Sequence, residues 1–92
     1  MIYVDELSFW PGVPDPFKNG YCHLTTDGPL EDLFVFARKL RLRRSWFQDS
    51  RVPHYDLTPH KRILALKAGA VFLSSKEQMR RRRENCSDER RN

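Results

Sequence analysis

The chain has 92 residues, which is enough for one small domain and too few for two. Hydrophobic residues make up 39% and charged residues 32%, and no apolar run approaches the length of a bilayer span, so we expect a folded protein without a membrane partner. The net charge of +5 favours partners that carry negative charge, such as nucleotides, nucleic acid or an acidic protein surface.

The cysteines and the first residues indicate the compartment. Cys22 and Cys86 lie far apart and lack CxxC spacing, so neither a thiolate zinc site nor a disulfide framework is predicted. The start MIYVDELSFWPG has neither the basic region nor the apolar region of a signal peptide. We therefore expect a cytoplasmic protein with free thiols.

The first third of the chain predicts two strands around a loop. Residues 2–4 form a short β-favouring run that ends at Asp5. Residues 10–20, WPGVPDPFKNG, are rich in proline and glycine, which excludes regular structure. Residues 21–26, YCHLTT, predict a second strand, which Asp27 and Gly28 close.

A helix is predicted from Pro29 to about residue 41. Proline suits a first helical position, and acidic residues follow in the first turn and basic residues in the last, where each favours the helix dipole. Apolar residues recur at spacings of three and four. They are Leu30, Leu33, Phe34, Ala37 and Leu40. A weaker strand is predicted at 53–57.

A second helix is framed by Thr58 as N-cap, Pro59 at the first helical position and Gly69 just beyond the end. Residues 70–74, AVFLS, then predict a strand of the buried type. A chain in which strands alternate with helices in this way favours a sheet with helical connections.

A third helix is predicted to begin at Ser74, because Glu77 three residues later completes a capping-box pattern. We expect one α/β domain over residues 1–77, followed over residues 78–92 by a basic helix end and a tail that frays beyond Asn85. The arginine run in this tail is typical of a solvated helix end, or alternatively of an unspecific contact with nucleic acid.

The order of elements predicts an α/β fold: a small, mainly parallel sheet of three to four strands covered by three helices. In such sheets ligands bind beyond the carboxyl ends of the strands. Asp5, Asp27 and Asp56 each end a predicted strand, so they could hold a divalent cation such as magnesium for phosphoester chemistry. The alternative is that these carboxylates only cap helices and turns.

The histidines offer a second set of candidates. His23, His54 and His60 together with Asp56 could form a zinc site, although no pair has the i, i+4 spacing that aligns two imidazoles on a helix. His54 and Asp56 fall on one face of an extended strand, which suits an acid–base pair. The catalytic candidates are therefore His54, Asp56 and His23, and the sequence leaves open whether any reaction is catalysed.

Residues 43–57, RRSWFQDSRVPHYDL, combine cations, aromatic rings and polar side chains. Guanidinium groups beside aromatic rings are suited to phosphates and stacked bases. The alternative is a solvated helix end followed by aromatic residues that pack in the core. The ligand-binding candidates in this segment are Arg43, Arg44, Trp46, Gln48, His54, Tyr55 and Asp56.

The loop 7–20 carries Phe9, Trp10 and Phe17 and suggests another function. Exposed aromatic residues can anchor a protein interface. On this alternative the chain is an interaction protein that uses these aromatic residues to bind another protein.

The motifs YVD, HLTTD, RRSWFQ, PHYDL and KRILALKAGA, taken together, resemble the family called domain of unknown function 4031 over most of residues 1–77. The resemblance implies a small bacteriophage or bacterial protein of the cytoplasm, and it implies no activity. The resemblance also points to particular residues as candidates for a functional site. The residues that match are Asp5, His23, Asp27, Arg44, Trp46, Phe47, Gln48, His54, Tyr55 and Asp56.

Three functions follow from these patterns. The leading hypothesis is a protein that binds a phosphorylated ligand, either a nucleotide or nucleic acid, at the carboxyl-end rim of the sheet. The enzymatic alternative is a metal-dependent phosphoesterase or nuclease that uses Asp5, Asp27 and Asp56. The third is the phage-encoded inhibitor of a host factor.

Overall fold

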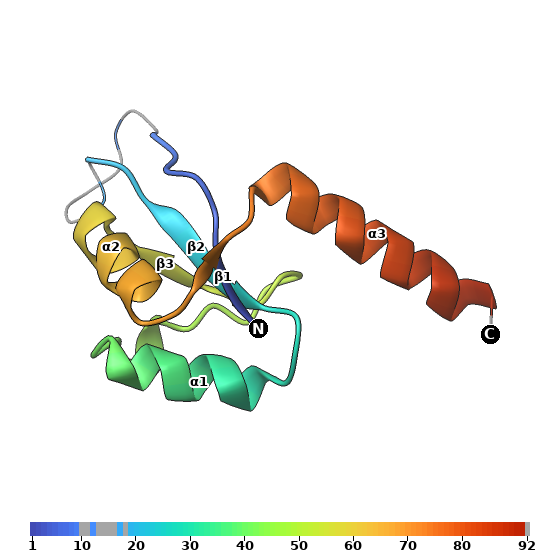
Figure 1. Ribbon diagram of the computed structural model, residues 1–92, viewed down its shortest axis with the longest axis horizontal. Coiled ribbons are helices and arrows are strands. Elements are labelled where there is room, and N and C mark those ends of the chain that lie inside the picture. The colour runs from blue at the N-terminus through green and yellow to red at the C-terminus, as the bar shows by residue number, and fades with distance from the viewer. Residues whose placement is uncertain (10–11, 13–16, 18, 92) are drawn as a thin grey trace.

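The computed structural model describes residues 1–9, 12, 17 and 19–91, and for residues 85–91 it describes the backbone alone. The elements are β1 (Ile2–Val4), β2 (Cys22–Thr26), α1 (Leu30–Lys39), η1 (Arg44–Trp46), β3 (Tyr55–Leu57), α2 (Pro59–Lys67), β4 (Val71–Phe72) and α3 (Ser75–Arg91). Within the described residues, four strands form one sheet; α1, the short 3-10 helix η1 and α2 lie in the connections between strands, and α3 follows the last strand (Figure 1).

The sheet has the strand order β3-β2-β1-β4, with β2 antiparallel to both neighbours and β4 parallel to β1. The predicted α/β class is confirmed, but the prediction of a mainly parallel sheet is wrong. Ser8 and Tyr21 form an antiparallel bridge, so the segment between β1 and β2 folds back on itself. A parallel pair would need a crossover there, and antiparallel strands do not.

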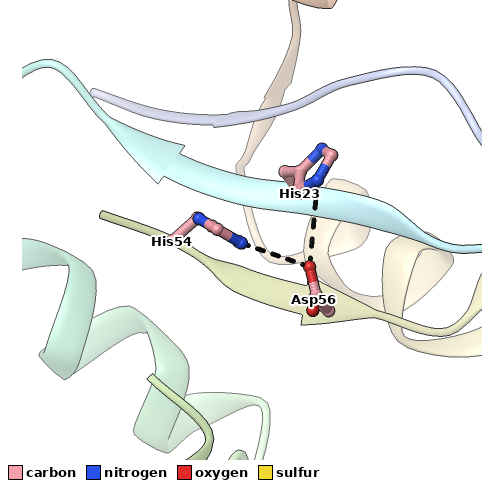
Figure 2. A group of neighbouring side chains, drawn as sticks. All are labelled: His23, His54 and Asp56. Carbon is pink, nitrogen blue, oxygen red and sulfur yellow. Dashed lines mark ion pairs between the residues drawn. The ribbon is translucent and has the colours of Figure 1, made fainter. Parts of the chain in front are cut away.

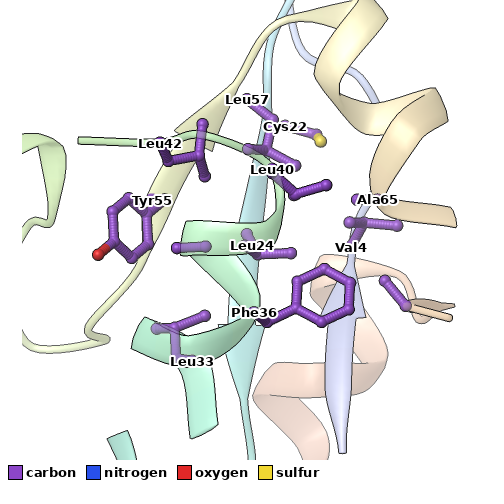
Figure 3. Close-up of a cluster of buried hydrophobic side chains, with 12 residues drawn as sticks. Val4, Cys22, Leu24, Leu33, Phe36, Leu40, Leu42, Tyr55, Leu57 and Ala65 are labelled. Carbon is purple, nitrogen blue, oxygen red and sulfur yellow. The ribbon is translucent and has the colours of Figure 1, made fainter. Parts of the chain in front are cut away.

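The core lies on one face of the sheet, under α1 and α2 (Figures 1 and 3). Alternate strand residues point to this face, which buries Val4, Leu24 and Tyr55 almost completely. From α1, Leu33 and Phe36 pack onto the same cluster. The side chains between these apolar positions therefore point to the opposite face of the sheet.

The caps predicted for α2 are confirmed. The Thr58 hydroxyl accepts a hydrogen bond from the Lys61 amide at 3.2 Å, Pro59 opens the helix, and Gly69 has a φ of 111°, which favours glycine. Helix α2 leads to β4 at the edge of the sheet. The strand predicted within 70–74 is present as Val71–Phe72, but both residues are exposed, so the prediction that it is a buried strand is wrong.

Helix α3 begins where the capping pattern predicts, because the Ser74 hydroxyl accepts a hydrogen bond from the Glu77 amide at 3.2 Å. The Glu77 carboxylate pairs with Arg80 instead of returning to the helix start. The helix extends to Arg91, beyond the end predicted near residue 85, and it projects away from the body (Figure 1). Of the helices that the structure describes, none has the length and apolar character needed to cross a membrane.

Candidate metal centre

The face of the sheet opposite the core carries a row of polar side chains. In the antiparallel register His23 of β2 lies directly across from Asp56 of β3, and Asp5 follows β1 on the other side of His23. Since His23 alternates with the buried Cys22 and Leu24, its ring must lie on this outer face. The register therefore places three ionisable side chains side by side.

Two imidazoles and one carboxylate converge in this row (Figure 2). The His54 Nε2 atom lies 3.4 Å from Asp56 Oδ1, and the His23 Nε2 atom lies 3.8 Å from the same oxygen. The three candidate ligand atoms all lie within 4.8 Å of one another. In a tetrahedral zinc site with bonds of ~2.1 Å, neighbouring ligand atoms are ~3.4 Å apart. The spacing thus suits a shared cation.

The other ring nitrogen of each histidine contacts an acceptor. His23 Nδ1 lies 2.7 Å from Asp5 Oδ2, and His54 Nδ1 lies 2.7 Å from the Val52 carbonyl oxygen. A carboxylate and a carbonyl can only accept a hydrogen bond here, so each Nδ1 must carry a proton. In the neutral rings both Nε2 atoms then have a free lone pair, and both point toward Asp56.

The pKa of each of these groups depends on the charges and hydrogen bonds of its neighbours. The hydrogen bond to Asp5 raises the pKa of His23 above its ordinary value against the opposing effect of burial. The hydrogen bond that the protonated His54 ring donates from Nε2 to Asp56 likewise raises the pKa of His54. Burial acts to raise the pKa of Asp56, but hydrogen bonds from His54 and Gln48 and the nearby imidazoles outweigh it and lower that pKa. Asp56 is therefore a carboxylate, as metal ligation requires.

A second layer of residues holds His23, His54 and Asp56 in place. The Gln48 side-chain amide donates to Asp56 Oδ2, which leaves Oδ1 free to face the histidines. Gln48 is itself fixed to His54 by two backbone hydrogen bonds of 2.9 and 3.1 Å. Asp5 is only 4% exposed and also accepts from the His23 amide, while Arg62 donates to the Asp5 carbonyl oxygen at 3.0 Å. Such outer partners fix the tautomer and orientation of metal-binding side chains.

Cavities adjoin the His23–His54–Asp56 group on two sides. One of about 340 Å³ lies under the start of α3 and is lined by Asp5, His23, Thr25, Ser50, Arg51, Val52, His54, Ser75, Gln78, Met79 and Arg82. The other is about 570 Å³ and is lined by Phe17, Leu42, Ser45, Trp46, Gln48, Asp56, Thr58 and Lys61. The group is therefore accessible to a ligand from both sides.

The structure brings Asp5 and Asp56 to one place, as the sequence suggests, but not Asp27. Because β2 runs antiparallel to β1, the residue that follows β2 lies at the opposite end of the sheet. There Asp27 accepts hydrogen bonds from the Tyr3 hydroxyl and the Met1 ammonium group, both at 2.9 Å. The structure therefore does not assemble the predicted site of three aspartates, whereas three members of the predicted histidine set, His23, His54 and Asp56, do come together.

Several predicted ligand-binding residues lie elsewhere. The Arg44 guanidinium stacks 4.1 Å from the centre of the Phe34 ring, and Tyr55 is buried in the core at 1% exposure. Arg43 lies against Trp46, and neither of these arginines lines the two cavities described above. His60 is exposed on α2, and Trp10 of the aromatic loop lies outside the described residues.

Some functional candidates were missed from the sequence. Arg51 and Arg82 line the cavity beside the histidines, and Lys61 lines the cavity beside Asp56. Arg82 lies in the run of arginines that suggested a solvated helix end, and only the fold of α3 brings it to the sheet. No local motif marks these positions, because the contacts join segments far apart in the chain.

Comparison with known proteins identifies the family. No curated protein and no solved structure matches the chain. The sequence model of the family described as "Protein of unknown function (DUF4031)" matches residues 2–85. That range contains the two histidines and the aspartate as well as every residue described above as holding them in place. The resemblance seen in the sequence motifs is therefore confirmed, and the chain belongs to the DUF4031 family of proteins of unknown function.

Proposed function

We propose that this protein is a metal-dependent phosphoesterase whose cation is bound by His23, His54 and Asp56. One observation carries the proposal: the two Nε2 atoms and Oδ1 face one another while a hydrogen bond holds the remaining polar atom of each side chain. An ordinary surface ion pair needs no such complete outer support. Preorganised ligands of this kind are typical of metal centres.

The ligand set indicates the class of cation and of chemistry. Two imidazoles and one carboxylate suit zinc, iron or manganese better than magnesium, which prefers oxygen ligands. Three protein ligands leave coordination positions for water and substrate, as in catalytic sites. A bound cation of this type lowers the pKa of water and polarises a phosphoryl oxygen, so no protein nucleophile is needed.

The surroundings favour a phosphate ester as substrate. Arg51 and Arg82 line the same cavity as both histidines, and Ser50 and Ser75 add hydroxyl groups to its wall. Guanidinium groups bind phosphate oxygens with two parallel hydrogen bonds, and the cation would bind a further oxygen. Asp5 also lines this cavity, but its carboxylate is engaged with His23. The free charges there are therefore positive.

Metal binding is tested first. Cobalt(II) or zinc(II) is titrated into the metal-free protein and followed by calorimetry and, for cobalt, by visible absorption. We expect one site that is lost in His23→Ala, His54→Ala and Asp56→Ala and kept in His60→Ala, because His60 is exposed on α2 and outside the group. Equal binding by His54→Ala and the unaltered protein would contradict the proposal.

Hydrolysis is tested next, with p-nitrophenyl phosphate and bis(p-nitrophenyl) phosphate as the monoester and diester probes. We expect metal-dependent release of p-nitrophenol, with a higher KM in Arg51→Ala and an unchanged KM in Lys67→Ala, which removes an exposed cation of α2. A protein that binds the metal ion and hydrolyses neither ester would contradict the hydrolytic function and leave only ligand binding.

A further inference from the structure

The cavity beside Asp56 has a composition unlike that of the arginine-lined one. It measures about 570 Å³, within the range of 300–1,000 Å³ common for small-molecule sites. Its wall combines the apolar side chains of Phe17, Leu42 and Trp46 with the polar groups of Ser45 and Lys61. A phosphate group alone would leave most of this space and all of the apolar wall unused.

Trp46 is held in place but open to a ligand. It ends the short helix η1, and its side chain is 50% exposed although the ring is large and apolar. The Arg43 guanidinium lies 5.7 Å from the centre of the Trp46 ring, which orients the indole through a cation–π contact. Leu42 beside it is only 7% exposed, so the bottom of the cavity is anchored in the core. The indole thus offers a fixed aromatic wall.

The cavity is continuous with the metal-binding group. Asp56 and Gln48 line it, and together with Phe17 they also line the smaller opening formed by His23 and His54. A ligand whose phosphate lies at the His23–His54–Asp56 group can therefore extend toward Trp46. The Lys61 ammonium group, fixed by a 2.6 Å hydrogen bond to the Leu40 carbonyl oxygen, adds a positive charge along this path.

We propose that the cavity between Trp46 and Phe17 binds the base of a nucleotide whose phosphate lies at the His23–His54–Asp56 group. This inference rests on the proposed function and specifies its substrate class. A nucleobase is planar, stacks on an indole ring and presents polar edges to groups such as the Ser45 hydroxyl and the Gln48 amide. A sugar phosphate has no planar apolar face that could cover Trp46.

The substrate is either a free nucleotide or the terminal nucleotide of a single strand, because both present the same base and phosphate. The probes are adenosine 5′-monophosphate, ribose 5-phosphate and a five-nucleotide oligodeoxyadenylate, each titrated into the zinc-loaded protein. The chain has two tryptophans, so Trp10→Phe serves as the background in which the fluorescence reports Trp46 alone.

We expect adenosine 5′-monophosphate to quench Trp46 and to bind at least about fivefold more tightly than ribose 5-phosphate, since stacking on one aromatic side chain contributes ~1 kcal/mol or more per base. Calorimetry, which needs no tryptophan, compares the Trp46 variants: Trp46→Ala should remove this preference and Trp46→Phe should retain most of it. Ile63→Ala, which removes an exposed apolar side chain from α2, is the control and should bind as the unaltered protein does. If the oligonucleotide binds more tightly than adenosine 5′-monophosphate, the site is assigned to strand ends. If it binds more weakly, the site is assigned to free nucleotides.

Two results would overturn the inference and distinguish it from the proposed function. Equal affinity for adenosine 5′-monophosphate and ribose 5-phosphate, in a protein that hydrolyses bis(p-nitrophenyl) phosphate, would remove the base site and leave the phosphoesterase intact. Failure to bind zinc at all would overturn both the base site and the proposed phosphoesterase, since the phosphate would then lack the cation that binds it.

Discussion

The candidate metal centre consists of a few side chains whose roles depend on their hydrogen-bond partners. His23 and His54 differ from the exposed His60 because each has its Nδ1 atom fixed by an acceptor. Asp5 is the clearest case: both of its oxygens contact His23, one at the ring and one at the backbone amide. Under the proposed function, Asp5 is thus a positioning residue, and Asp56 is the carboxylate that would ligate the cation.

The first prediction concerns this division of roles. Asp5→Asn keeps the shape of the side chain but removes the negative charge that orients and polarises His23. We expect zinc affinity to fall by roughly 10–100-fold, the usual effect of losing an outer partner of a metal ligand. Competition with a chelator measures the affinity, and circular dichroism confirms that the variant is folded. Asp32→Asn, an exposed carboxylate of α1, is the control; an equal loss there would contradict a specific role for Asp5.

The second prediction concerns pH. Since the folded pKa values of His23 and His54 are raised, their protonated forms stabilise the metal-free protein below an ordinary value of ~6.5, and this stability is lost as the pH rises through the raised values. A metal ion binds only the neutral rings. Zinc affinity should therefore increase from about pH 5.5 to about pH 8. Competition titrations at several pH values measure it, and an affinity independent of pH would exclude histidine ligands.

At the scale of helices and strands, the sequence predicts a boundary correctly where the interactions that form it lie within a few residues of each other. The caps of α2 and the start of α3 depend on side chains within a few residues, and these boundaries were predicted from Thr58, Gly69 and Ser74. The directions of the strands depend on how distant segments pair, which periodicity does not encode. One signal was available: the segment between β1 and β2 contains no helical pattern, and a parallel connection needs such a crossover.

The candidate site was predicted only in part, for the same reason. Alternation in CHLTT and PHYDL indicates which residues share a face of a strand, so His54 and Asp56 could be paired from the sequence. The third ligand, His23, depends on the antiparallel register that sets it opposite Asp56. With parallel strands, Asp27 would have occupied that end of the sheet instead. The mistaken strand direction therefore grouped Asp27 with Asp5 and Asp56, and only the register shows that His23, and not His60, joins His54 and Asp56.

A third prediction concerns the contact of α3 with the sheet. Gln78 is 6% exposed; its oxygen accepts from the Thr25 hydroxyl at 2.8 Å and its nitrogen donates to the Leu73 carbonyl oxygen at 2.7 Å. Gln78→Ala leaves the buried Thr25 hydroxyl and the partly buried Leu73 carbonyl oxygen without these bonds, which costs about 1–3 kcal/mol of the free energy of unfolding. Urea denaturation measures this loss. Met79→Ala, an exposed neighbour, should change stability by less than about 0.5 kcal/mol, and equal effects would show that Gln78 does not anchor the helix.

At the scale of the whole molecule, one face of the sheet forms the core and the other carries the candidate site. The apolar face packs against α1 and α2 and forms the core, and the polar face carries the His23–His54–Asp56 group under the first turns of α3. A chain of 92 residues buries a small core, so its free energy of unfolding is modest. A ligand that binds only the folded state therefore has a large relative effect on stability.

The last prediction follows from this linkage. His23 in β2 and Asp56 in β3 come together only when the two strands pair, so a metal ion that bridges them binds the folded chain and not the unfolded one. At a free zinc concentration about 100 times the dissociation constant, mass action adds ~2.7 kcal/mol of stability. In a domain of this size that raises the Tm by roughly 10–20 °C. Differential scanning calorimetry with and without zinc measures the shift, and a chelator should reverse it. The same shift in His54→Ala would show that the ion binds elsewhere. If the shift is retained in His60→Ala and lost in His54→Ala, the ion stabilises the sheet by binding at the polar face.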